Sequence, residues 1–166
     1  MNISRFMTEE LIVLDFISEQ ETSPENSHSL KWKERNKERI LSDLVAILDI
    51  SGKIANRNKI IIDFINRERK ATTAIGMGVA IPHVRSMQAK DFILGFARSI
   101  DGYDFGSLDG ELTHLFFAMA APPYDDNLYL RVFKALSSNL QYDDFRRELM
   151  QAEKPFDIIR AFRNME

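Results

Sequence analysis

Two apolar runs constrain the fold of this chain more than any other feature of its sequence. They cover residues 92–99 (FILGFARS) and 112–120 (LTHLFFAMA), and both are rich in residues that favour β-strands. Strands with so few polar positions are too apolar to be exposed on both faces. The runs therefore predict strands of a sheet that other elements pack against.

Two helices are predicted before these strands. From Leu30 the apolar residues recur at helical spacing among charged ones, and Gly52 provides a left-handed stop. A second amphipathic pattern begins near Asn56, a favourable N-cap, and runs to about Glu68. The segment before the first helix, residues 20–29, is polar and aperiodic and is predicted to be a loop.

Further elements complete the pattern. A short strand is predicted at residues 78–81, and a helix capped by Asp125 or Asp126 follows the apolar runs. Two more helical patterns lie at residues 145–149 and 155–162. Helices, then strands, then helices indicate an α/β sandwich. With 166 residues and no internal repeat, the chain is expected to form one domain.

The composition excludes several classes of function. The 22 basic residues are scattered among 25 acidic ones, for a net charge of −3, so we expect no nucleic-acid partner. The absence of cysteine removes disulfides, thiolate metal sites and cysteine nucleophiles together. The three histidines show neither HxH nor HExxH spacing, so no metal site is expected.

The N-terminal segment does not resemble a signal peptide. Glu9, Glu10 and Asp15 lie among its apolar residues, where a signal peptide has a basic start and an unbroken apolar stretch. No later run approaches the length of a membrane span. We therefore expect a cytoplasmic protein without direct membrane insertion.

The residues best suited to chemistry lie in segment 67–85, which has the sequence RERKATTAIGMGVAIPHVR. His83 follows Pro82 at the end of the predicted short strand, and Pro82 restricts Ile81 to extended geometry, so the imidazole is held at an edge. A neutral imidazole is nucleophilic near physiological pH and suits reversible phosphoryl transfer. The candidate donors for phosphoryl oxygens in this segment are Thr72, Thr73, Arg67, Arg69 and Arg85.

On chemistry alone a second interpretation of His83 stays open, because a histidine after a strand is often a loop residue bonded to the backbone. Gly76 and Gly78 lack the further residues of a dinucleotide loop or a phosphate-binding loop, so they indicate a turn. His114 is expected to be a strand-end residue, and His28 a solvated loop residue.

The run TTAIGMGVAIPH, from Thr72 to His83, with Arg67 and Glu68 before it, resembles a known active-site signature. It is similar to that of the type IIA domains of the bacterial phosphoenolpyruvate-dependent sugar phosphotransferase system, in the fructose, mannitol and nitrogen-regulatory branch. The resemblance covers about residues 30–161. It implies an α/β fold with a mixed sheet flanked by helices on both sides, a three-layer α/β/α sandwich.

The resemblance also implies a function. It assigns His83 as the phosphorylated histidine and Arg67 as the active-site arginine. From the chemistry of the segment, Thr72, Thr73 and Arg85 are expected to support the phosphoryl group, together with Tyr129. The histidine phosphocarrier protein would be the phosphoryl donor, with no metal or organic cofactor. Where the family commonly has a second histidine, this chain has Tyr129, whose hydroxyl donates one hydrogen bond but cannot become cationic.

Two roles for such a domain stay open. His83 would pass its phosphoryl group to the IIB domain of a sugar transporter, or its phosphorylation state would regulate a protein such as a potassium transporter or a sensor kinase. The alternative is a non-catalytic regulatory binding module with slow or lost phosphotransfer. Phe105, Met77 and Met87 are candidates for an apolar rim on which the carrier protein docks. Core packing or a place in a mobile loop is the alternative interpretation of these three residues.

Overall fold

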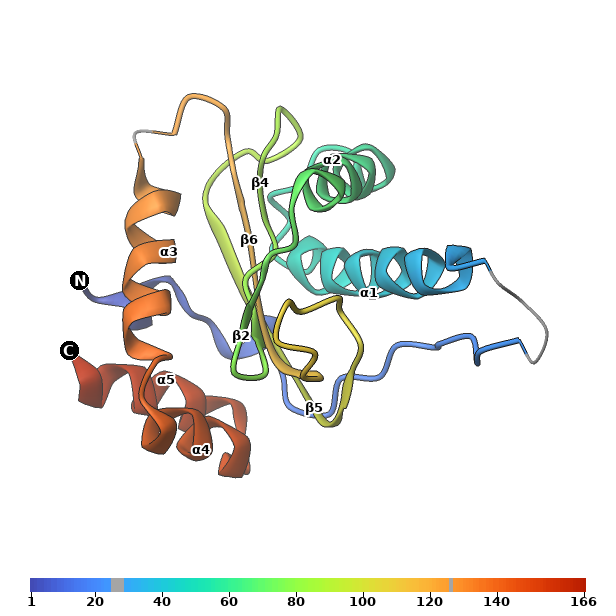
Figure 1. Ribbon diagram of the computed structural model, residues 1–166. Coiled ribbons are helices and arrows are strands. Elements are labelled where there is room, and N and C mark those ends of the chain that lie inside the picture. The colour runs from blue at the N-terminus through green and yellow to red at the C-terminus, as the bar shows by residue number, and fades with distance from the viewer. Residues whose placement is uncertain (25–28, 126) are drawn as a thin grey trace.

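The computed structural model of the protein describes residues 1–24, 29–125 and 127–166. Within these residues six strands form one mixed sheet in the order β1-β5-β6-β3-β2, and β4 also pairs with β6. Helices cover both faces of the sheet (Figure 1). The predicted three-layer α/β/α sandwich is therefore confirmed.

The sheet is centred on two long antiparallel strands, β5 and β6, which coincide with the two apolar runs. Both are predicted correctly, although β5 extends four residues beyond the expected end. β6 pairs on its other side with β3 and β4, both of them parallel to it. The strands are β1 (Ile12–Val13), β2 (Ala74–Gly76), β3 (Val79–Ala80), β4 (His83–Arg85), β5 (Ile93–Tyr103) and β6 (Thr113–Ala121).

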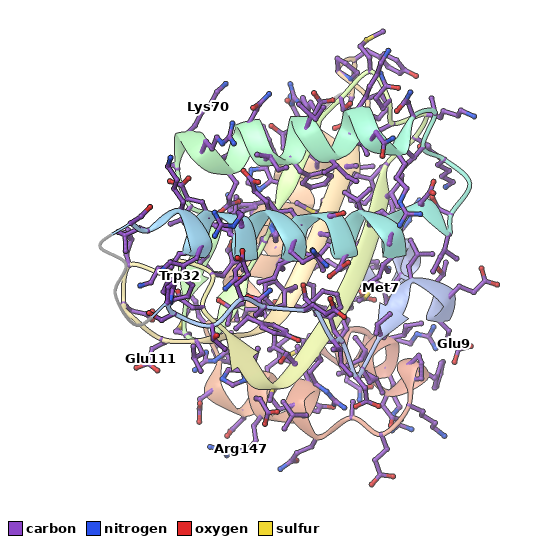
Figure 2. The ribbon with its side chains drawn as sticks, turned by 90° about the vertical axis from the view of Figure 1, so that its right-hand side faces the viewer. Met7, Glu9, Trp32, Lys70, Glu111 and Arg147 are labelled. Carbon is purple, nitrogen blue, oxygen red and sulfur yellow. The ribbon has the colours of Figure 1, made fainter. Side chains whose placement is uncertain are left out.

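One helical layer consists of α1 (Lys31–Asp49) and α2 (Arg57–Lys70), which lie side by side across the sheet (Figure 2). The other consists of α3 (Leu128–Asn139), α4 (Asp143–Gln151) and α5 (Pro155–Met165), with the 3-10 turns η1 (Ile3–Phe6) and η2 (Glu9–Leu11). Each predicted helix is present. The Asn56 side chain caps α2 as expected, because its Oδ1 accepts from the Lys59 amide at 3.0 Å.

The hydrophobic core forms two clusters, one on each face of the sheet. Successive residues of β6 alternate between them, with Leu115 and Phe117 facing the layer of α3 and α5, and Phe116 and Ala118 facing α1 and α2. A strand buried on both faces needs apolar residues at every position, which explains why β6 appears as an unbroken apolar run.

The start of α3 differs in detail from the prediction. The helix begins at Leu128, and Asn127 occupies the N-cap position with a φ of 65° and no side-chain capping bond. Asp125 still serves the first turn, because its carboxylate accepts from the Tyr129 amide at 3.1 Å. Asp126 lies outside the described residues, as does His28 in the predicted loop.

The described part of segment 20–29 has no regular secondary structure, in agreement with the loop prediction. Across the part of the chain that the structure describes, none of the helices combines the length and hydropathy needed to cross a bilayer.

Candidate active site

His83 is the first residue of β4 and not, as predicted, a residue just beyond the end of a strand. Pro82 lacks an N–H group and interrupts the ladder between β3 and β4, yet the chain stays extended along β6, where Met119 donates to the Pro82 carbonyl at 2.9 Å. Because β4 pairs only with β6 within the described residues, His83 does lie at an edge of the sheet.

The imidazole of His83 is fixed by its own backbone. Its Nδ1 lies 2.7 Å from the Ile81 carbonyl oxygen. A carbonyl can only accept, so Nδ1 carries the proton and Nε2 is left with a free lone pair. The rings of Tyr129 and Phe133 on α3 lie against the imidazole, at centroid distances of 5.9 and 5.0 Å. The side chain is therefore held in one tautomer and one orientation.

Burial lowers the pKa of His83 below its ordinary value. The bond to the Ile81 carbonyl raises this pKa in part, the Arg67 guanidinium lowers it again, and the Glu68 carboxylate raises it slightly. The net shift is downward, so the ring is neutral at physiological pH. Nε2 is then available as a nucleophile.

His83 lines an open cavity of about 550 Å³ together with several cations. Arg67 and Lys70 reach it from α2, Arg85 from β4, and Tyr129 from α3. Four of the predicted site residues thus meet in one place: His83, Arg67, Arg85 and Tyr129. Guanidinium groups around a nucleophile are well matched to a phosphoryl group, whose oxygens accept forked hydrogen bonds.

The two arginines are held differently. Arg67, in the last turn of α2, donates from Nη1 to the Ala71 carbonyl at 3.0 Å, just past the helix end. Arg85 donates from Nη2 to Asn127 Oδ1 at 3.2 Å, and its guanidinium carbon lies 4.4 Å from the centre of the Tyr129 ring.

The structure gives Thr72 and Thr73 a different environment from the expected one. Thr73 is buried, and both its hydroxyl and its amide donate to the Glu68 carboxylate, at 2.6 and 2.8 Å. Lys37 of α1 also contacts Glu68, at 2.8 Å, and donates to the Thr72 hydroxyl at 3.4 Å. Neither threonine lines the cavity of His83. The Thr73 hydroxyl is therefore committed to Glu68, whereas donation from the Thr72 hydroxyl, which accepts from Lys37 and the Ala74 amide, stays a prediction.

The network of Lys37, Glu68 and Thr73 was missed by sequence reasoning. The available signal was a glutamate on the core-facing stripe of α2, a position where a carboxylate needs buried partners. In the described residues no group of three histidine, aspartate or glutamate side chains is arranged to hold a metal ion.

Comparison with known proteins shows the family of this chain. The sequence model of the family described as "Phosphoenolpyruvate-dependent sugar phosphotransferase system, EIIA 2" matches residues 24–165. The chain belongs to this family.

Two relatives illustrate the range of EIIA proteins. The chain is 35% identical over 134 residues to a fructose-specific EIIABC component from Bacillus subtilis, a match that covers 80% of this chain and 21% of that protein. It is 30% identical over 125 residues to a fructose-specific EIIA component from Haloferax volcanii, covering 75% of this chain and 81% of the relative. The chain thus spans about a fifth of the first relative and about four fifths of the second.

Solved structures share the fold of this EIIA chain. The nitrogen regulatory protein IIA-Ntr from Neisseria meningitidis has a TM-score of 0.79 at 22% identity, over 96% of this chain and 98% of that one. Mannitol enzyme IIA from Escherichia coli, solved in complex with phosphorylated enzyme IIB, has a TM-score of 0.71 at 15% identity, over 95% and 97% of the two chains.

Only one of the three predicted rim residues lies at the cavity of this EIIA chain. Met87 lines it and is 78% exposed. Phe105 is fully buried beneath the Lys37 ammonium, which explains why the prediction for Phe105 was wrong. Met77 lies in the turn between β2 and β3, before the start of β3, whereas His83 lies beyond the end of β3. The Met77 sulfur contacts Arg146.

His114 lies at the start of β6, outside the cavity. Its Nδ1 is within 3.0 and 3.1 Å of the Ser99 and Ile100 carbonyl oxygens. This is the backbone-bonded strand-end position expected for it.

Proposed function

We propose that His83 accepts a phosphoryl group from the histidine phosphocarrier protein through Nε2 and passes it on, in the cytoplasm. The observation that carries this proposal is the 2.7 Å contact between His83 Nδ1 and the Ile81 carbonyl, which leaves Nε2 unprotonated on a ring that lines the cavity. The lowered pKa of His83 acts in the same direction, because it keeps the ring neutral.

The transfer needs few protein groups. The Nε2 lone pair attacks phosphorus, a new N–P bond forms, and the N–P bond of the donor breaks with its electron pair left on the donor imidazole. The phosphorylated ring of His83 keeps its Nδ1 proton and gains positive charge, which the Ile81 carbonyl stabilises. Arg67 binds the phosphoryl oxygens with the donors that its bond to Ala71 leaves free.

Other residues support this site. Arg85 and Tyr129 line the cavity, Arg85 as a further donor to the phosphoryl oxygens and Tyr129 as a ring against which His83 and Arg85 pack. Thr72 and Thr73 hold their backbone segment in place. The Thr73 hydroxyl donates to Glu68, and the Thr72 hydroxyl accepts from Lys37, which is paired with Glu68.

For the acceptor, we propose a IIB domain of a sugar transporter. The fructose-specific relatives and the complex of Escherichia coli mannitol enzyme IIA with phosphorylated enzyme IIB support this choice. A second candidate is a regulated protein, such as a potassium transporter or a sensor kinase, and the 30% identity to a nitrogen regulatory protein from Bradyrhizobium diazoefficiens favours it. Transfer of radiolabelled phosphate from His83 to a purified fructose IIB domain distinguishes the two.

Intact-mass spectrometry tests the phosphoacceptor. We expect one acid-labile phosphoryl group after incubation with phosphoenolpyruvate, the general phosphotransferase enzyme and the carrier protein. The His83→Ala variant should gain none, whereas the matched control His114→Ala should be labelled like the wild type, because His114 lies outside the cavity. An unlabelled wild type at any enzyme excess would leave the non-catalytic binding module as the better interpretation.

A further inference from the structure

The guanidinium of Arg85 is held in place only by weak interactions. Its guanidinium lies over the Tyr129 ring at 4.4 Å and donates to the neutral Asn127 carboxamide at 3.2 Å. Arg85 forms no ion pair with a carboxylate anywhere in the described residues, whereas many other basic side chains of the protein do. An exposed cation–π contact and one neutral acceptor hold a guanidinium far less firmly than an anion does.

The same residue is placed to reach the reacting atom. His83 and Arg85 are two apart on β4, so their side chains leave the same face of the strand. Both contact Tyr129, with 5.9 Å between the His83 and Tyr129 ring centres and 4.4 Å from the Arg85 guanidinium to that ring. The Arg85 guanidinium and the His83 ring thus contact the same aromatic side chain and line the same cavity.

We propose that Arg85 is a mobile phosphoryl-binding arm with two positions. When His83 is free, the Tyr129 ring and Asn127 hold Arg85 aside; when His83 is phosphorylated, Arg85 leaves them and binds the phosphoryl oxygens. Tyr129 then acts through its ring, as a positioning residue, and not through its hydroxyl. This inference rests on the proposed phosphorylation of His83.

The hydrogen bond that caps the start of α3 does not involve Arg85. Asn127 occupies the N-cap position, but its side chain accepts from Arg85 and caps nothing. Asp125 accepts from the Tyr129 amide instead. Withdrawal of Arg85 therefore leaves the helix capped, while it uncovers the Tyr129 ring and frees the Asn127 carboxamide. A protein that docks on this end of the EIIA domain meets a different surface in the two phosphorylation states.

The two positions of Arg85 are tested by the equilibrium constant for phosphoryl transfer from the carrier protein to this chain. Variants that remove contacts of the phosphorylated state should lower this constant, and variants that remove contacts of the free state should raise it. Arg85→Gln removes a charge-assisted bond of the phosphorylated state and only the weaker contacts of the free state, so the equilibrium constant should fall about tenfold. Tyr129→Leu and Asn127→Gly remove contacts present only in the free state, so each should raise it about twofold to threefold. Glycine is chosen at position 127 because it accepts the positive φ found there.

The matched control is Arg131→Gln. Arg131 is an exposed cation on α3, four residues after Asn127, and does not line the cavity. Its loss removes the same charge and should shift the constant by less than about twofold, because solvent screens exposed charges. A fall of the constant in Tyr129→Leu would overturn the proposal, since it would mean that Tyr129 itself binds the phosphoryl group. An Arg85→Gln variant equal to the wild type would overturn it equally.

NMR observes the movement directly. In the free protein the Arg85 side-chain signals should be shifted by the Tyr129 ring current, and this shift should persist in Tyr129→Phe and vanish in Tyr129→Leu. On phosphorylation of His83 the ring-current shift should disappear in the wild type. If it persists in a phosphorylated wild type, Arg85 does not move; if the wild type takes no phosphate, the proposed function itself has failed.

Discussion

Replacing Thr73 with valine separates a structural role from a phosphoryl-binding one. Thr73→Val keeps the shape of the side chain and removes the hydroxyl that donates to Glu68 at 2.6 Å. The Glu68 side chain is only 4% exposed, so water cannot replace the lost donor. A buried hydrogen bond to a charged group contributes about 1.5–3 kcal/mol, so we expect the free energy of unfolding to fall by about 2 kcal/mol.

Urea denaturation followed by circular dichroism measures this loss, and mass spectrometry measures phosphorylation of the same samples. The Glu68 carboxylate keeps its bonds to the Thr73 amide and to Lys37, so the folded variant should still be phosphorylated on His83. Thr73→Ser is the matched control, because it retains the hydroxyl and loses only a methyl group. The structural reasoning is refuted if Thr73→Val is as stable as the wild type but is no longer phosphorylated.

Three further predictions concern other parts of the molecule. Because the pKa of His83 is lower in the folded protein, the unfolded chain binds the extra proton first as pH falls below about 6.5. Denaturation curves should therefore show that the free energy of unfolding of the wild type decreases below about pH 6.5, and this decrease should be smaller in His83→Gln. Arg98 is buried and donates to the carbonyls of Leu14, Leu149, Met150 and Ala152, so Arg98→Met should cost about 4 kcal/mol of unfolding free energy, and a cost below about 1 kcal/mol would contradict this. Met77 has a φ of 58° beside Gly78 in the β2–β3 turn, so Met77→Asn should raise the melting temperature, with a gain of about 0.5 kcal/mol.

The parts of the fold that could be predicted from sequence are those whose pattern is local. β5 and β6 carry an unbroken apolar signal over their length, and α2 has an N-cap that forms the predicted bond within the same turn. β4 could not be found in this way, because Pro82 is a strong local signal for the end of a strand. Its continuation depends on pairing with the end of β6, where Met119 lies opposite His83 although the two are far apart in the sequence.

In the candidate site, too, the residues of a local motif were predictable, whereas contacts made by tertiary packing were not. The motif around His83 and its resemblance to a known signature brought His83, Arg67, Arg85 and Tyr129 together correctly as residues of one cavity. The partners of Thr73 were not predictable, since a hydroxyl in a sequence does not reveal which donor or acceptor the fold presents to it. That partner, Glu68, is buried by packing of α1 on α2, and Lys37 reaches it from another helix.

The threonine network and the reactive ring are connected through the backbone. Glu68 fixes Thr73, and the Thr73 carbonyl accepts from the Ile81 amide at 2.9 Å. In an extended chain the N–H and C=O of one residue point to the same side, so the Ile81 carbonyl also faces away from β6. β4 has no second neighbour in the described sheet, and this carbonyl is left for His83 Nδ1. The edge position thus supplies the acceptor that fixes the tautomer, and Glu68 holds Thr73, which in turn binds the strand segment that leads to His83.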